Sequence, residues 1–388
     1  MTDPQPLGVY VHWPYCARIC PYCDFNVVRD RKQAEQADLA AAILADLTAQ
    51  RVLTGPRRLV SVFLGGGTPS LMDPVWAADI VATARRLWDA EPDLEVSLEA
   101  NPTDAEAGRF AAFADAGVTR LSLGLQSFDD DALTFLGRNH DAAEARRAAD
   151  LAAKTFPRLS VDMIYALPGQ TVAAWREQLA RAIDLGAEHI SPYQLTIETG
   201  TAFDRAVGRG LFRPADDETG AALYDTTQQV LGGAGFDAYE VSNHARGEAA
   251  RSRHNLIYWR GQDYVGVGPG AHGRLTLHGA RTATDAAARV GDYIRNVGET
   301  GLGFREPEAL SPVARAEERL LMGLRTDEGV GFEELAALGL TAAHPVVAGL
   351  VGEGLLAADP ARLRATRAGR LVLDGVTRDL ILNANPPH

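Results

Sequence analysis

The chain has three cysteines, Cys16, Cys20 and Cys23, and all of them lie in one short segment with the spacing CxxxCxxC. Thiolates are soft ligands that suit iron–sulfur clusters, copper(I) or zinc, and so short a loop can bring them only to one corner of a metal centre. A cubic four-iron cluster held by three cysteines has one iron without a protein ligand. The spacing therefore favours a [4Fe–4S] cluster with an iron that is open to a substrate or cofactor.

Two other uses of these thiols have to be weighed. A disulfide is disfavoured because the number of cysteines is odd and no signal peptide is recognised, so we expect the reducing environment of the cytoplasm. A structural zinc ion would need a fourth ligand, which His12 or Asp24 could supply, although such sites usually join two knuckles from separate segments. A zinc-stabilised adaptor therefore stays an alternative.

Composition limits the classes of partner. The 388 residues are 46% hydrophobic, enough for one large domain and a small one. The formal net charge of −13 argues against binding to a phosphate backbone, so no nucleic-acid partner is expected. No apolar run reaches the roughly 18 residues of a spanning helix, which predicts no membrane span and leaves peripheral membrane contact open.

Six apolar segments alternate with segments of helical character. The expected strands cover residues 7–12, 59–64, 94–99, 120–125, 159–164 and 189–195. Helical periodicity or capping signals fall at 33–53, 77–87, 103–117, 141–154 and 172–185. This alternation predicts an α/β fold with a parallel sheet and crossover helices.

The second half of the chain reads differently. Residues 198–304 look like an extension that completes a core domain spanning 1–305, and a linker lies near 306–312. In the remaining domain, 306–388, three helices precede a hairpin at 355–366 and a last helix from about residue 369. This order resembles a winged helix, which in an acidic chain indicates a protein contact or a lid rather than a DNA reader.

Polar groups follow the expected strands where ligands bind in parallel sheets, beyond the carboxyl ends. The sequence GGGTP at 65–69 follows the second strand, and its glycines would let the backbone approach a ligand closely. Glu99 closes the third strand and could accept hydrogen bonds from both hydroxyls of a ribose. A tight turn and a solvated charge are the simpler readings of these two features.

The strand followed by CxxxCxxC resembles the radical S-adenosylmethionine (SAM) superfamily. The flanking sequences YVHWPYC and CPYCDF narrow the likeness to the group of the coproporphyrinogen III dehydrogenase HemN and the HemW-type haem chaperones. The resemblance covers nearly the whole chain. It implies a partial (β/α)6 barrel with a C-terminal winged-helix-like domain, a [4Fe–4S] cluster on Cys16, Cys20 and Cys23, and SAM chelated to the open iron.

The resemblance also implies binding residues, and it assigns no catalytic residue. The family's SAM positions fall on Tyr10, Tyr22, Gly66, Gly67, Thr68 and Glu99, with the ring of Tyr22 on the adenine. Three further polar positions match Gln126, Arg138 and Asp162. In the dehydrogenase these three hold a second SAM, whereas here they could contact SAM, shape the pocket or bind another ligand.

Two departures separate the chaperones from the dehydrogenase. Phe25 stands where the dehydrogenase has a further cysteine, and fifteen residues before Cys16 leave no room for its longer N-terminal arm. The sequence HNxxYW, which begins at His254, resembles a chaperone motif in which a neutral imidazole would ligate haem iron. His254 could equally be a hydrogen-bonded core residue, and His272 in GPGAHG is the rival haem ligand or a wall of the SAM pocket.

We therefore expect a haem chaperone that binds haem and passes it to acceptor haem proteins. The family resemblance suggests that these acceptors are haem proteins of respiratory chains. The alternative is an enzyme that oxidatively decarboxylates propionate groups of coproporphyrinogen III, for which arginines would clamp the carboxylates.

Overall fold

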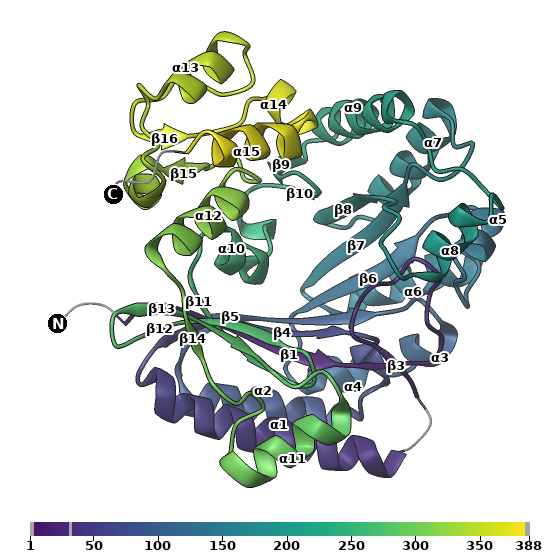
Figure 1. Cartoon of the computed structure of the whole chain (residues 1–388). Helices are drawn as coiled ribbons and strands as arrows, with labels where there is room; N and C mark the ends of the chain where they lie inside the picture. The colour runs from purple at the N-terminus through teal and green to yellow at the C-terminus, as the bar shows by residue number, and fades with distance from the viewer. Residues whose placement is uncertain (1–3, 31–32, 385–388) are drawn as a thin grey trace.

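The computed structural model describes residues 4–30 and 33–384, and a sheet of twelve strands forms its centre (Figure 1). Six neighbouring strands run parallel in chain order and confirm the predicted α/β fold. They are β1 (Pro6–Trp13), β4 (Arg58–Gly66), β5 (Asp89–Ala100), β6 (Arg120–Gln126), β7 (Arg158–Tyr165) and β8 (His189–Gln194). Because the two edge strands of the sheet, β14 (Glu308–Ala309) and β9 (Asp237–Glu240), are not paired with each other, the barrel is open.

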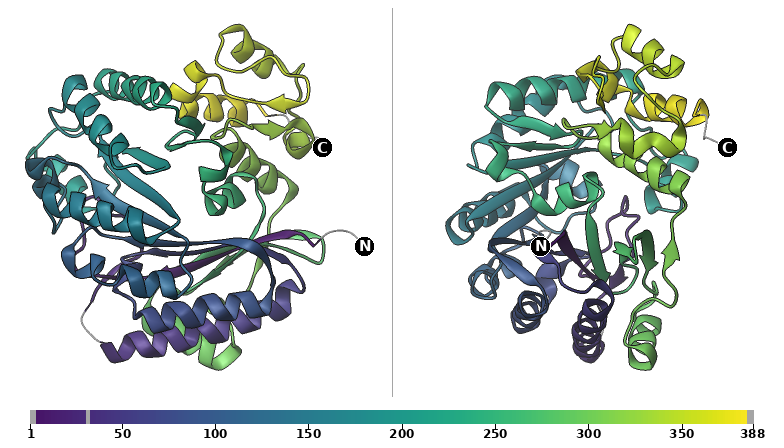
Figure 2. Two further views of the ribbon diagram at one scale, coloured as in Figure 1. Left: turned by 180° about the vertical axis from the view of Figure 1, so that it is seen from behind. Right: turned by 90° about the vertical axis from the view of Figure 1, so that its left-hand side faces the viewer.

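Helices follow the parallel strands and cover the outer face of the sheet (Figure 2). They are α1 (Gln33–Thr54), α2 (Pro74–Leu87), α3 (Asp104–Ala107), α4 (Phe110–Asp115), α5 (Asp130–Phe135), α6 (Ala142–Thr155) and α7 (Val172–Ile183). The predicted capping box of Asp141 and Glu144 is present at α6. The helix expected over 103–117 is two short helices, separated by residues 108–109.

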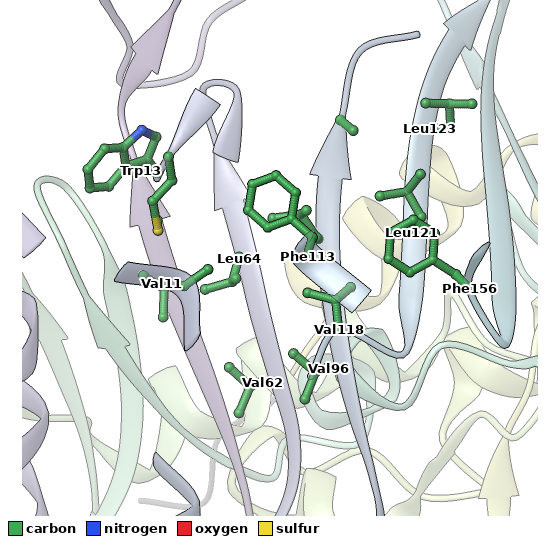
Figure 3. Close-up of a cluster of buried hydrophobic side chains, with 14 of the residues drawn as sticks. Val11, Trp13, Val62, Leu64, Val96, Phe113, Val118, Leu121, Leu123 and Phe156 are labelled. Carbon is green, nitrogen blue, oxygen red and sulfur yellow. The ribbon is translucent and has the colours of Figure 1, made fainter. Parts of the chain in front are cut away.

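The two faces of the parallel strands differ in chemistry. Val11, Val62 and Val96 point outward and pack under the helices in a continuous apolar core (Figure 3). The alternate positions, which point to the inner face, carry polar side chains such as Ser61 and Ser97. Parallel strands buried on both faces are usually apolar throughout, and the polar inner face of this sheet departs from that pattern.

The extension adds strands to both edges of the parallel sheet. Next to β1 lies β11 (Asp263–Val267), which runs parallel to it and leads into the antiparallel strands β12 (His272–Leu277), β13 (Ala280–Asp285) and β14. Next to β8 lies the hairpin of β10 (Asn243–Ala245) and β9. The connecting helices are α8 (Ala202–Gly208), α9 (Asp217–Gly233), α10 (Arg253–Trp259) and α11 (Val290–Thr300), with a short 3-10 turn η2 (Glu248–Ala250).

The C-terminal region has its own hydrophobic cluster. It contains α12 (Pro312–Gly323), η3 (Phe332–Leu338), α13 (Pro345–Gly352), α14 (Arg367–Leu371) and α15 (Leu373–Leu382), with the short strands β15 (Val330–Gly331) and β16 (Arg362–Leu363). The expected hairpin at 355–366 is present as an antiparallel bridge between Leu356 and Ala365, with backbone hydrogen bonds from Ala357 to Arg364 and from Thr366 to Leu355, and β16 also pairs with β15. Among the described residues, no helix is long and apolar enough to cross a membrane.

Candidate functional site

A cavity of about 360 Å³ opens on the inner face of the barrel, beyond the carboxyl ends of the parallel strands. All three cysteines line it, together with eight of the nine residues predicted to hold SAM. These eight are Tyr22, Gly66, Gly67, Thr68, Glu99, Gln126, Arg138 and Asp162. The fold thus brings polar groups from six separate segments to one place, as expected for a ligand site of a parallel α/β sheet.

The cysteine segment forms a loop that is held from both sides. It begins in β2 (Tyr15–Cys16), which pairs with β3 (Val28–Arg29), and the N–H of Cys23 donates to the carbonyl of Cys20 at 3.2 Å. The side chain of Asn26 donates to the carbonyls of Pro269 and Ala288 at 2.9 and 2.8 Å. Backbone carbonyls of the extension (residues 198–304) therefore hold the cysteine loop in place through hydrogen bonds within the protein.

Two cysteine sulfurs accept hydrogen bonds from predicted site residues. The hydroxyl of Thr68 donates to Cys16 Sγ at 3.6 Å, and the guanidinium of Arg138 donates to Cys20 Sγ at 3.5 Å. Burial raises the pKa of Cys16 to about 11 and also raises the pKa of Cys23. Because a metal ligand has to be a thiolate, metal binding releases these protons, and the donated hydrogen bonds stabilise the thiolate form.

The surroundings of the cysteines fit an iron–sulfur cluster better than zinc. His12, one of the two candidate fourth zinc ligands, has Nδ1 at 2.9 Å from the Tyr10 hydroxyl and Nε2 at 2.8 Å from the carbonyl of Asn26, so both ring nitrogens are engaged; the other candidate, Asp24, lines the cavity. The three thiols border a cavity that has room for a small molecule beside a metal centre. A cluster bound by protein on one side and by a ligand on the other suits this arrangement.

The GGGTP segment continues β4 into the cavity. Gly66 has φ +112, which favours glycine, and its N–H donates to the Glu99 carboxylate at 3.0 Å. A Cβ on Gly67 would come within 2.7 Å of the backbone of Pro14, so a larger residue would push the glycine segment away from the cysteine loop. The short 3-10 turn η1 (Pro69–Leu71) follows directly.

Two carboxyl groups face the cavity. The pKa of the Glu99 carboxyl is raised to about 8, chiefly because the group is buried and also because the negative charge of Asp162 lies nearby. Burial also raises the pKa of Asp162 to about 6, and the Ser122 hydroxyl donates to its carboxylate at 3.1 Å. Carboxyl groups in this setting can accept hydrogen bonds from hydroxyls or from an ammonium group of a ligand.

Glu99 makes the stability of the cofactor-free protein depend on pH. The pKa of its carboxyl rises from 4.5 in the unfolded chain to about 8, so the native state holds a proton that the unfolded state releases in this window. The free energy of unfolding therefore falls as the pH rises from 4.5 to 8. We expect Glu99→Gln to raise the melting temperature clearly at pH 8 and much less at pH 5. Thermal melts of both cofactor-free proteins test this, and an equal shift at both pH values would contradict it.

Gln126 and Arg138 also line the cavity, and Arg138 lies beside Cys20. Gln126 lies at a bulge at the end of β6 and has φ +67, an unusual conformation for a side chain other than glycine. The guanidinium of Arg138 donates to Asn101 Oδ1 at 2.5 Å and to the carbonyl of Gly124 at 2.9 Å. Asn101 lines the cavity and was missed from the sequence, because Asn before proline is typical of an ordinary turn.

Tyr10 and His254 lie outside the cavity lining. His254 belongs to α10, which packs inside the barrel against β1 and β4 (Figure 1), and its side chain stacks on Phe63 with ring centroids 4.9 Å apart. His254 is 1% exposed; its Nδ1 is 2.9 Å from Ser61 Oγ and its Nε2 is 2.6 Å from the Tyr258 hydroxyl. Burial lowers the pKa of this imidazole to about 3, so it is neutral.

His272, the rival haem ligand, is exposed at the start of β12. Its side chain is 66% exposed, and Nδ1 lies 2.6 Å from the Asp285 carboxylate. Among the described residues that line the cavity, His272 does not occur. Its predicted role as a wall of the SAM pocket is therefore not supported by its position.

A buried ion pair joins α10 to the inner face of the sheet. Arg120 donates to the Glu95 carboxylate at 3.0 Å, to Ser160 Oγ at 3.0 Å and to the carbonyl of Ala250 at 3.0 Å. The other oxygen of Glu95 accepts the first N–H groups of α10, including that of Arg253 at 2.8 Å. The position of the HNxxYW segment thus depends on this ion pair.

The chain was compared with known families and proteins. The model of the radical SAM superfamily matches residues 10–182, and that of the HemN C-terminal domain matches residues 310–372. The mitochondrial "Radical S-adenosyl methionine domain-containing protein 1" of Bos taurus is 41% identical over 389 residues, which cover 97% of this chain and 88% of the relative. The "Heme chaperone HemW" of Escherichia coli is 38% identical over 285 residues, covering 72% of this chain and 73% of the relative.

Two further matches extend these findings. The "Heme chaperone HemW" of Mycobacterium tuberculosis strain H37Rv is 35% identical over 380 residues, covering 97% of this chain and 95% of the relative. The solved coproporphyrinogen III oxidase HemN of E. coli superposes with a TM-score of 0.80 at 21% identity, over 97% of this chain and 90% of HemN, which shows the shared fold. The chain therefore belongs to the radical SAM superfamily, in the family that includes the radical S-adenosyl methionine domain-containing proteins 1 and the heme chaperones HemW.

Proposed function

We propose that this protein is a haem chaperone that binds haem and transfers it to acceptor haem proteins, using a [4Fe–4S] cluster and SAM. Membership of the superfamily implies these two cofactors. The observation that carries the proposal is the single cavity that unites the three cysteines with Gly66, Gly67, Thr68 and Glu99, in a chain whose relatives include heme chaperones HemW.

Different cavity residues would bind different parts of the two cofactors. Cys16, Cys20 and Cys23 would hold the cluster, which when bound supplies an open iron for the amino and carboxylate groups of SAM. The backbone at Gly66 and Gly67 would line the aminoacyl group, and Glu99 would accept the ribose hydroxyls. Gln126, Arg138 and Asp162 would line the remaining part of the site.

Two aromatic residues complete the proposed SAM site. The ring of Tyr22 lines the cavity and lies 6.3 Å from the ring of Phe203, which supports it from α8, so it can stack on the adenine. Tyr10 would support the SAM site indirectly, through His12. The Tyr10 hydroxyl is hydrogen-bonded to the His12 imidazole, which is in turn hydrogen-bonded to the carbonyl of Asn26 next to the cysteine loop.

Phe25 separates this function from porphyrinogen decarboxylation. Its side chain is 62% exposed at the rim of the cavity, where an apolar ring has replaced the additional cysteine of the dehydrogenase. Anaerobic protein with a reconstituted cluster should bind haem stoichiometrically and should form no protoporphyrinogen from coproporphyrinogen III, SAM and a reductant. Protoporphyrinogen formation without a stable haem band would replace this proposal with the dehydrogenase reaction.

His254 is our proposed haem ligand, and its surroundings define what ligation requires. The imidazole is neutral and can donate an electron pair to iron, yet Nε2 is engaged by the Tyr258 hydroxyl at 2.6 Å. Haem binding at this residue would therefore open the bond to Tyr258 and move α10 away from the inner face of the sheet.

Substitutions at the two histidines test the haem ligand. We expect His254→Ala to weaken the haem absorption band by more than half and His272→Ala to leave it unchanged, at equal cluster content. Tyr258→Phe keeps the aromatic ring and frees Nε2, so it should preserve or strengthen the band. Titration with haem, followed by absorption spectroscopy, measures all three variants. Loss of the band in His272→Ala alone would transfer the ligand to the exposed site.

We propose a boundary between the core and the C-terminal domain at residues 305 and 306. The C-terminal domain would serve protein contacts, with haem acceptors, including those of respiratory chains, as partners, and the cytoplasm is the proposed location. Arg325 of the C-terminal domain pairs with the buried Glu240 at 2.5 Å, and Arg251 pairs with Asp327 at 2.7 Å. These pairs would transmit an acceptor contact to the segment that carries α10.

A further inference from the structure

Two of the cysteine sulfurs are joined by a continuous set of hydrogen bonds through Asn101. Its Nδ2 donates to Thr68 Oγ1 at 3.2 Å, and the Thr68 hydroxyl donates to Cys16 Sγ at 3.6 Å. On the other side, Arg138 donates to Asn101 Oδ1 at 2.5 Å and to Cys20 Sγ at 3.5 Å. We call Thr68, Asn101 and Arg138 the sulfur bridge.

The chemistry of the bridge fixes how the asparagine amide is turned. A guanidinium has only donors, so the side of Asn101 that faces Arg138 has to be the carbonyl oxygen. The amide nitrogen then faces Thr68 and donates a hydrogen bond to its hydroxyl oxygen. The hydroxyl proton is therefore free to be donated to Cys16 Sγ. An alanine or leucine at 101 could not direct both donors in this way.

The backbone holds Asn101 in this position. It lies just after β5, two residues beyond Glu99, and its N–H donates to the Glu106 carboxylate at 2.9 Å. Glu106 is itself buried and bonded to the hydroxyl of Ser70 in the turn that follows Thr68. The asparagine is therefore fixed by groups that do not touch the cysteines.

We propose that Asn101 is a positioning residue that orients the hydrogen-bond donors on Cys16 and Cys20, and so sets the reduction potential and the retention of the bound cluster. This inference rests on the proposed cluster site. Hydrogen bonds to cluster sulfurs stabilise the reduced, more negative state and raise the potential. Groups behind the ligands typically change metal affinity by roughly 10–100-fold.

Four variants separate this role from simple packing. Asn101→Ala removes the link between both donors, and Thr68→Val removes the donor to Cys16 while keeping the shape of the side chain. Thr68→Ser restores a hydroxyl and serves as the rescue. Asn139→Ala is the matched control, since Asn139 lines the same cavity and no hydrogen bond of its side chain is found in the described part of the chain.

The measurements are iron per chain, the rate of iron release to a chelator, and the reduction potential from a titration followed by electron paramagnetic resonance, all without SAM. We expect Asn101→Ala and Thr68→Val to have more negative potentials and iron release roughly ten-fold faster than the wild type. Thr68→Ser and Asn139→Ala should match the wild type. The effects of Asn101→Ala and Thr68→Val should be less than additive in the double variant, because one acts through the other.

Each outcome decides between the proposals. A wild-type protein that holds no cluster after reconstitution overturns the proposed cluster site and this inference with it. A wild type with a full cluster, and variants with unchanged potential and release rate, overturns the inference alone. If Asn101→Ala does not fold, Thr68→Val against Thr68→Ser decides whether the bridge sets the potential.

Discussion

Replacing Cys16, Cys20 and Cys23 together with alanine is expected to reduce the iron content from about four atoms per chain to nearly none, while the protein stays folded. The fold should survive because the loop is held by protein groups, among them the bonds of Asn26 to Pro269 and Ala288. Iron and sulfide analysis of anaerobically reconstituted protein, with a thermal melt, measures both effects.

Single replacements serve as the control for this result. Since a four-iron cluster needs all three thiolates here, each single Cys→Ala variant should also lose most of its iron. Stoichiometric zinc in the wild type, with no iron or sulfide after anaerobic purification, would contradict the cluster and support a structural zinc site.

Arg120→Met is expected to lower the free energy of unfolding by about 3–5 kcal/mol, the usual cost of leaving one partner of a buried ion pair alone. The side chains of Arg120 and Glu95 are each 2% exposed, and without Arg120 the Glu95 carboxyl would have only backbone donors and Arg158 nearby. Because Glu95 also holds the first turn of α10, the variant should loosen the HNxxYW segment.

Chemical denaturation of the cofactor-free protein measures this change. The matched control is Arg146→Ala, which breaks an ion pair whose side chains are 50% and 49% exposed, and whose loss should cost about 0.5 kcal/mol or less. Equal losses of unfolding free energy in the two variants would show that breaking the buried Arg120–Glu95 pair costs no more than breaking an exposed pair.

Much of the core could be predicted from the sequence because its signals are local. Each of the six parallel strands is a short apolar run, and the caps of α3 and α6 are visible as pairs such as Asp141 with Glu144. The order of these strands in the sheet follows from short right-handed crossovers, so the polar groups at their carboxyl ends were expected to meet.

The strands of the extension were missed because their partners are distant in sequence. The strand β11 pairs with β1, more than two hundred residues earlier, and no pattern within residues 263–267 announces that pairing. The same holds for the pairing of β16 with β15, because η3 and α13 lie between these two strands in the sequence. Short strands with non-local partners carry little local information.

The cavity residues show the same limit at the level of side chains. Asn101 has an unremarkable sequence context, and its importance emerges only when the fold places Thr68 on one side and Arg138 on the other. The reverse holds for His254, where a motif marked the residue but could not show that Ser61 and Tyr258 engage both ring nitrogens.

Transfer of haem is the most direct test of the proposed chaperone function. The protein with its reconstituted cluster and one equivalent of haem is mixed anaerobically with an apo-haem protein, and the absorption spectrum of the acceptor is followed with and without SAM. We predict that the chaperone's haem band decays as the acceptor's band rises, and that His254→Ala supplies haem no faster than free haem does. Wild-type protein that transfers haem no faster than free haem reaches the acceptor, or that keeps its haem, would contradict a chaperone function.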